Sequence, residues 1–237
     1  MTTKKKYILV INPISGDIDK SDILEKTKQF AANLNIDIIV YETTGKKDDN
    51  KIKKLYLKHN PERVLIAGGD GTIKMVAEAL EKHDVIFGII PAGSANGLAI
   101  DMNLPTTLEE NIKVAFENNC IEIDMIEING NKSLHLSDIG LNALLVKNYE
   151  GGNVRGKLGY ALNIVSTLIE SEEPFKVTIE FENKKIECEA QMIVIANSQK
   201  YGTGVVINPL GVINDGKFGI IVLKNVNLIT IGKIITG

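Results

Sequence analysis

Short apolar runs alternate with amphipathic stretches over roughly the first half of the chain. Four of these runs have the length and composition of buried strands: residues 7–11, 36–41, 63–67 and 85–90. The stretches between them place apolar side chains at helical spacing, over about residues 22–34, around 52–57 and over 73–80. Regular alternation of this kind is typical of a doubly wound, mostly parallel sheet. It predicts an α/β domain over residues 1–120.

The pattern changes after about residue 120. Apolar residues over 121–128 lead to Asn129-Gly130, a strong hairpin signal, and a strand is expected to return over 133–146. Residues 175–181 alternate apolar and polar side chains, 183–185 supply a turn, and 186–196 and 217–224 read as further strands. One helix is expected over 158–169 and another from 227 to 235. This half predicts an antiparallel β-sandwich domain over residues 121–237.

Each of the four parallel strands ends in a small, polar or glycine-rich segment. The C-terminal ends of parallel strands share one edge of the sheet, where such folds bind their ligands. One segment of this kind can be an ordinary loop, whereas four on the same edge indicate a ligand site. The segments are Asn12-Pro13-Ile14-Ser15-Gly16, Glu42-Thr43-Thr44-Gly45, Gly68-Gly69-Asp70-Gly71-Thr72 and Pro91-Ala92-Gly93-Ser94-Ala95-Asn96-Gly97.

The turn from Gly68 to Thr72 carries the most specific chemistry. It joins a buried strand to a helix, and its glycines let the backbone approach a phosphate at the positive end of the helix dipole. A carboxylate at such a place repels phosphate unless it holds a cation, so Asp70 points to Mg²⁺–nucleotide chemistry. The alternative is a tight turn that only caps the helix.

Composition narrows the classes further. A formal net charge of −3 gives no general attraction to nucleic acid, and Cys120 and Cys188 suggest neither a metal site nor a disulfide framework. The chain has no G-x-x-x-x-G-K-[ST], no G-x-G-x-x-G after the first strand and no G-x-S-x-G, which argues against a P-loop, a dinucleotide site and a hydrolase triad. We find no signal peptide or spanning segment and expect a cytoplasmic protein.

Several motifs occur together over nearly the whole chain. They are Asn12-Pro13-x-x-Gly16, then Thr43 or Thr44, Gly68 to Thr72, Pro91 to Ala99, Ile123-Asp124, Arg155-x-x-Leu158-Gly159-Tyr160, and Pro209 followed by Asp215-Gly216. With them the chain resembles the diacylglycerol kinase catalytic-domain family, which includes sphingosine kinases and bacterial lipid kinases of NAD-kinase-like fold. The segment around Ser94 and Asn96 is the specific one, because Gly-Gly-Asp-Gly is shared with NAD kinases and phosphofructokinases.

The resemblance implies that Mg²⁺–ATP binds between the two domains and phosphorylates a lipid hydroxyl of diacylglycerol or sphingoid type. It implies a catalytic role for Asp70 near the metal and phosphates, and a structural Mg²⁺ held by Asp215 together with Asp124. The nucleotide contacts that it implies are Asn12, Pro13, Ser15, Gly16, one of Thr43 and Thr44, Gly68, Gly69, Asp70, Gly71, Thr72, Gly93, Ser94 and Asn96. A homodimer and transient contact with the inner membrane surface are compatible with it.

The chain also departs from the family pattern. Lys74-Met75 stands where the family usually has Asn-Glu, and Gly97 replaces a frequent Asp. The family's general base is a Glu in a C-terminal Asp-Gly-Glu segment that the printed sequence lacks, so we expect a fragment of a longer kinase that transfers phosphate poorly. Two alternatives stay open: an NAD kinase or other small-molecule kinase of the superfamily, and a non-catalytic nucleotide- or lipid-binding relative.

Overall fold

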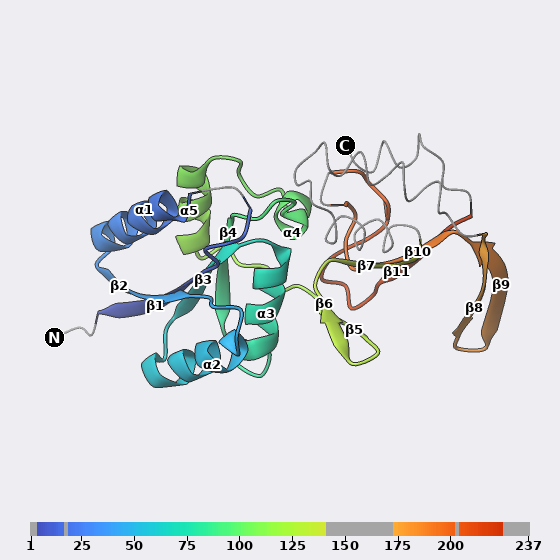
Figure 1. Ribbon diagram of the computed structural model, residues 1–237, viewed down its shortest axis with the longest axis horizontal. Coiled ribbons are helices and arrows are strands. Elements are labelled where there is room, and N and C mark those ends of the chain that lie inside the picture. The colour runs from blue at the N-terminus through green and yellow to red at the C-terminus, as the bar shows by residue number, and fades with distance from the viewer. Residues whose placement is uncertain (1–3, 17–18, 141–172, 202–203, 225–237) are drawn as a thin grey trace. The chain divides into compact units, whose positions relative to one another are not determined.

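The computed structural model describes residues 4–16, 19–140, 173–201 and 204–224. The chain divides into two compact units, the first running to Leu134 and the second starting at His135, with Gly204 grouped with the first. Each unit is described by itself below. Figure 1 shows the elements with their labels.

The first unit is built on a four-stranded parallel sheet in the order β2-β1-β3-β4. Every residue of β3 is buried, which explains why this strand is an almost continuous apolar run in the sequence. The four predicted strands are therefore confirmed, with bounds that differ by one or two residues. They are β1 (Lys5–Ile11), β2 (Ile36–Glu42), β3 (Arg63–Gly68) and β4 (Ile86–Pro91).

Helices cover both faces of this sheet. Figure 1 shows α1 and α5 on one face and α2 and α3 on the other, and each of these pairs is in contact. Asp19 caps α1 by accepting a hydrogen bond from the Ser21 amide, and Asn60 ends α2 in the left-handed conformation just before Pro61. The helices are α1 (Lys20–Asn33), α2 (Asp48–His59), α3 (Asp70–Leu80), α4 (Gly97–Asp101) and α5 (Leu108–Phe116).

Helices α4 and α5 lie in a part of the chain, residues 98–120, for which no element was predicted. The start of α5 does have a sequence signature: Thr107 and Glu110 have capping-box spacing before the buried Ile112 and Phe116. In the structure the Thr107 hydroxyl accepts from the Glu110 amide and donates to the Glu110 carboxylate, so this pair of residues caps α5 as its spacing indicates.

The predicted hairpin at Asn129-Gly130 is confirmed. It joins β5 (Ile126–Ile128) to β6 (Asn131–Ser133), and both loop residues have positive φ, as a two-residue hairpin turn requires. The flanking predictions differ from the structure over the residues that it describes, which exclude 141–146. Residues 121–125 lie outside any strand, and the expected strand over 133–146 is broken between β6 and β7 (Leu136–Gly140), because β6 pairs within the hairpin and β7 pairs in another sheet.

The described part of the second unit is antiparallel, as predicted. One sheet has the order β11-β10-β7, and a separate pair joins β8 (Phe175–Phe181) to β9 (Lys184–Ala190). The turn between β8 and β9 is Glu182-Asn183 rather than 183–185. The expected strand over 186–196 is two strands, since the chain leaves the β8–β9 pair at Gln191 and continues in the other sheet as β10 (Met192–Ala196), which pairs with β11 (Gly219–Leu223).

The helices expected over 158–169 and 227–235 lie outside the described residues. Within the described ranges, every helix is too short or too polar to cross a bilayer.

Candidate functional site

Three of the four predicted loop segments meet at the C-terminal edge of the parallel sheet. The Asn12 side-chain amide donates to the Thr72 hydroxyl at 3.0 Å, which links the turn after β1 to the first turn of α3. The Ser15 hydroxyl donates to the Ala92 carbonyl at 2.9 Å, which links the same turn to the segment after β4. Parallel neighbours in the sheet end side by side, so the strand order itself brings these turns together.

Close backbone contacts explain the glycines of these turns. A Cβ on Gly93 would lie 2.4 Å from the Cα of Gly69, and one on Gly16 would lie 2.9 Å from the carbonyl carbon of Gly93. Gly16 also has a φ of +58°, a region that other residues rarely adopt. Three glycines from three loops thus pack backbone against backbone, and a side chain at Gly93 or Gly16 would push the loops apart.

Asp70 anchors the segment that follows β4. It is the first residue of α3, and its two carboxylate oxygens accept hydrogen bonds from the amides of Gly97 (2.7 Å) and Leu98 (2.9 Å) at the start of α4. The structure therefore gives Asp70 a capping role, but toward a neighbouring helix. A carboxylate has about four lone-pair sites, so two such bonds leave it able to accept a hydrogen bond from metal-bound water.

Asn96 shapes the loop that leads into α4. Its side-chain oxygen accepts from the Gly93 amide at 2.7 Å, its nitrogen donates to the Gly93 carbonyl at 2.9 Å, and its own φ is +56°. Asparagine tolerates this left-handed conformation better than most residues do. The closed loop leaves Ser94 exposed at its tip.

The first turn of α3 is the open part of this site. The amides of Thr72 and Ile73 donate to the Gly69 carbonyl, whereas those of Asp70 and Gly71 precede this bonded turn and are left by helix geometry to outside acceptors. Gly71 is exposed, and a Cβ built on it meets nothing within 4 Å. The geometry leaves room for an anion to approach this helix end closely, and the binding of a phosphate there stays a prediction.

Thr43 and Thr44 lie in the turn after β2, which is held by Asp48. The Thr43 amide donates to the Ile11 carbonyl at 2.8 Å and so continues the pairing of β1 with β2. Asp48, the first residue of α2, accepts hydrogen bonds from the amides of Thr44 and Gly45 and from the hydroxyl groups of Thr44 and Tyr41. Four donors thus converge on this one carboxylate.

The donors around Asp48 decide its charge. Burial raises the pKa of its carboxyl, but the bonds from Tyr41, Thr44 and Gly45 together lower it by more, to about 2. Burial and the same Asp48 carboxylate raise the pKa of the Tyr41 hydroxyl to about 12. Asp48 is therefore an anion and Tyr41 a neutral donor over the physiological pH range.

A cavity of about 430 Å³ lies between this turn and α3. Gly45 lines it from the turn, Asp48 and Asp49 from the start of α2, and Met75 and Glu78 from α3. The turn after β2 thus borders the same helix whose first turn carries Asp70 and Gly71.

Two residues of the site were missed by sequence reasoning. Asp48 lies beside Asp49 in a polar stretch, and the sequence signal for it is that of an acid at the start of a helix. Lys20, the first residue of α1, donates to the carbonyls of Ser15 (2.5 Å) and Ala92 (3.0 Å) and so clamps two of the loops. No sequence signal identifies Lys20, because its role depends on loops far apart in the chain.

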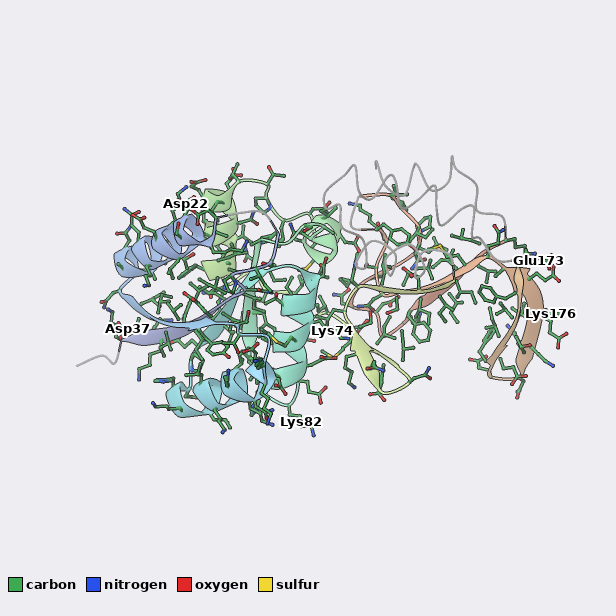
Figure 2. All side chains as sticks on the ribbon, viewed as in Figure 1. Asp22, Asp37, Lys74, Lys82, Glu173 and Lys176 are labelled. Atoms are coloured by element: carbon green, nitrogen blue, oxygen red, sulfur yellow. The ribbon has the colours of Figure 1, made fainter. Side chains whose placement is uncertain are left out.

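Other predicted residues lie apart from these contacts or are not tested by them. Lys74 is on the outer surface of α3 (Figure 2), and its ammonium is 3.7 Å from the Glu78 carboxylate in an exposed ion pair. Asp124 is in the first unit and Asp215 in the second, so their joint metal site stays a prediction. The described residues contain no cluster of three or more His, Cys, Asp or Glu side chains that could hold a metal.

Two family models match the chain and together span most of it. The model described as diacylglycerol kinase catalytic domain matches residues 6–128. The model described as YegS C-terminal NAD kinase beta sandwich-like domain matches residues 138–236. Both matches confirm the resemblance that the motifs indicated, and the second agrees with the predicted antiparallel fold of the C-terminal half.

Individual proteins give the same picture. A probable lipid kinase YegS of Salmonella arizonae is 27% identical over 215 residues, covering 88% of this chain and 71% of its own. The Escherichia coli O157:H7 protein of that name is 31% identical over 159 residues, covering 65% and 53%. Among solved structures, a diacylglycerol kinase from Bacillus anthracis superposes with a TM-score of 0.73 at 25% identity, covering 98% of this chain and 76% of its own.

Proposed function

Because the chain belongs to the diacylglycerol kinase catalytic-domain family, we propose that it is an ATP-dependent lipid kinase. It would transfer the γ-phosphate of Mg²⁺–ATP to the hydroxyl group of a lipid of diacylglycerol or sphingoid type. The names of its relatives, probable lipid kinase and diacylglycerol kinase, support the reaction class.

The observation that carries the proposal is the convergence of three glycine-containing loops on the open first turn of α3. Gly16, Gly69 and Gly93 pack against one another, and Gly71 beside them leaves room for a ligand. Phosphoryl transfer depends chiefly on positioning and on neutralising charge. Close backbone approach at a helix N-terminus provides both for a chain of phosphates.

The residues of this edge fit nucleotide and metal. The amides of Asp70 and Gly71 would donate to phosphate oxygens, and the exposed Ser94 and the Thr43–Gly45 turn would border the nucleotide. Asp70 would act on Mg²⁺ through its remaining lone pairs while keeping its bonds to Gly97 and Leu98. Bound Mg²⁺ would neutralise charge on the phosphates during transfer.

The test is phosphate transfer by the full-length protein from labelled Mg²⁺–ATP to diacylglycerol, a sphingoid base and NAD in parallel. We expect label in a lipid. Label in NAD alone would replace the lipid assignment by that of an NAD kinase, and label in no acceptor would favour a non-catalytic relative.

Asp70→Asn tests the proposed role of the acid, with the exposed Asp22→Asn on α1 as the control (Figure 2). We expect Asp70→Asn to lower transfer about a hundredfold or more, as loss of a charge-stabilising group does. Because the variant also weakens the bonds to Gly97 and Leu98, its Mg²⁺ requirement is measured as well. Activity within about tenfold of wild type, or an unchanged Mg²⁺ requirement, would argue against a metal role.

A further inference from the structure

The Asp48 carboxylate is enclosed by the turn that precedes it. Its Oδ1 lies 2.5 Å from the Tyr41 hydroxyl and 2.9 Å from the Thr44 hydroxyl, and its Oδ2 lies 2.6 Å from the Gly45 amide. The Thr44 amide is 3.0 Å from Oδ1 and 3.1 Å from Oδ2. Only 5% of the residue is exposed.

These bonds depend on one conformation of the turn. A buried carboxylate is costly unless hydrogen bonds replace its water. Here two of the replacements are the backbone amides of Thr44 and Gly45 in the turn, beside the hydroxyl groups of Thr44 and Tyr41, so the turn and the carboxylate hold each other in place. Lys47, between the turn and α2, has a φ of +54°, a strained value for lysine, and the surrounding bonds must maintain it.

The turn is also fixed relative to the sheet edge. Thr43 is tied to the Ile11 carbonyl, one residue before Asn12, whose side chain reaches Thr72. Gly45 and Met75 line the same cavity. A displacement of the turn would therefore change the space directly beside the first turns of α3.

We propose that Asp48 is a positioning residue for the nucleotide, holding the Thr43–Gly45 turn in the conformation that receives ATP. The inference rests on the proposed function, because it takes the edge beside α3 to be the nucleotide site. Asp48 acts through Thr44 and Gly45, and its low pKa keeps it charged for this task at neutral pH. The competing explanation is that Asp48 only stabilises its own turn.

The test is Asp48→Asn in the full-length protein, with Asp22→Asn as the matched control. Asp22 is also an acid in the first turn of a helix, but it lies on α1 and pairs with Lys26 at 3.0 Å. Asparagine keeps the shape of Asp48 but turns an N–H group toward donors. We expect the KM for ATP to rise about tenfold or more while kcat with saturating lipid stays within about threefold, since misplacing a binding group weakens ATP binding.

Amide hydrogen exchange provides a readout independent of activity. Residues 43–47 should exchange faster in Asp48→Asn than in wild type, and ATP should protect them in wild type. Faster exchange with an unchanged KM for ATP would mean that Asp48 serves only its own turn, and the proposal would be wrong. An unchanged exchange rate would contradict it as well.

Tyr41→Phe keeps the test open should Asp48→Asn fail to fold. It removes one donor to Asp48 and leaves the turn's own residues intact, so we expect a smaller rise in the KM for ATP, of about two- to fivefold. No rise at all would overturn the proposal.

The affinity for ATP, measured by calorimetry, separates the failure of the proposed lipid kinase function from the failure of the proposed role of Asp48. Wild-type protein that binds ATP without transferring phosphate contradicts the lipid kinase function alone, whereas wild-type protein that binds no ATP overturns both.

Discussion

At the scale of single residues, the glycines of the site differ in the space available for a side chain. A Cβ on Gly93 would clash with the Cα of Gly69, whereas a Cβ on Gly71 would meet no atom within 4 Å. The first is needed for the fold of the loops. The second has no structural reason to be glycine, which makes it the more informative about a ligand.

We predict that Gly71→Ala folds normally and loses activity. Alanine is the better helix former, so stability should stay the same or rise by up to about 1 kcal/mol. The added methyl group would occupy the space through which a phosphate would reach the helix end, so kcat/KM for ATP should fall about tenfold or more. Chemical denaturation and steady-state kinetics measure the two effects.

Gly93→Ala serves as the contrast to Gly71→Ala, because its Cβ would lie 2.4 Å from the Cα of Gly69. That variant should lose both stability and activity. Full activity in Gly71→Ala would mean that no ligand approaches this turn.

A second prediction at this scale concerns the stability of the folded protein at acidic pH. The pKa of Asp48 is about 2 in the folded protein, against an ordinary 3.8. A lowered pKa stabilises the folded state above the unfolded value, so about 2 kcal/mol of stability should be present above pH 4 and be lost as the pH falls toward 2. The difference in unfolding free energy between wild type and Asp48→Asn should shrink over that interval.

Lys113→Ala, on the exposed face of α5, is the control for this titration because it removes no acid. The difference in unfolding free energy between Lys113→Ala and wild type should stay constant over the same pH interval. If the difference in unfolding free energy between wild type and Asp48→Asn does not change between pH 4 and pH 2, the lowered pKa of Asp48 is contradicted.

At the scale of elements, a buried cation joins α5 to the sheet. Arg63 on β3 is 3% exposed; its guanidinium donates to the Ala115 carbonyl at 2.6 Å and to the Asn118 side chain at 3.2 Å, and it lies over the Tyr7 ring. Its partners are the C-terminal end of α5, where the helix dipole is negative, and no carboxylate is among them.

Replacing this cation should therefore destabilise the first unit. We predict a loss of about 2–4 kcal/mol for Arg63→Ala, from a cavity and from carbonyl groups left without donors. Arg63→Lys should recover only part of it, because one ammonium cannot reproduce the fork of the guanidinium. Urea unfolding followed by circular dichroism measures both, with the exposed Lys113→Ala as a control expected within about 0.5 kcal/mol. A fully stable Arg63→Ala would show that α5 is held by its apolar face alone.

The elements also show what the sequence could and could not predict. Strands β1 to β4 and the loops after them followed from apolar runs that end in glycine, since a buried parallel strand needs such a run. The split between β9 and β10 was not predicted, because no glycine or proline separates them. Only Gln191 lies between the two strands, which pair in different sheets. In the site, residue types predicted the convergence of the loops. The bonds from Asp70 to Gly97 and Leu98 were beyond sequence reasoning, since they join positions 27 and 28 residues apart.

At the scale of the whole molecule, ligand binding should raise the free energy of unfolding and therefore the melting temperature. A ligand that binds the folded chain alone stabilises it by about 2.7 kcal/mol at one hundred times its dissociation constant. For a chain of 237 residues, this corresponds to a rise in Tm of roughly 5–10 °C. Ligand that binds to the first unit should raise the melting temperature of that unit. If the two units melt separately, calorimetry of the whole protein would show the shift in the transition of the first unit.

We predict that Mg²⁺–ATP raises the Tm of the wild-type protein by this amount and that Gly71→Ala loses most of the shift. The reason is physical: phosphates bound to the amides of Asp70 and Gly71 would link the first turn of α3 to the loops that Gly69 and Gly93 pack together, so unfolding any of them would release the ligand. Adenosine without phosphates is the control and should shift the Tm far less. Equal shifts with ATP and adenosine, or an undiminished ATP shift in Gly71→Ala, would place the phosphates elsewhere and remove the basis for assigning nucleotide to this edge of the sheet.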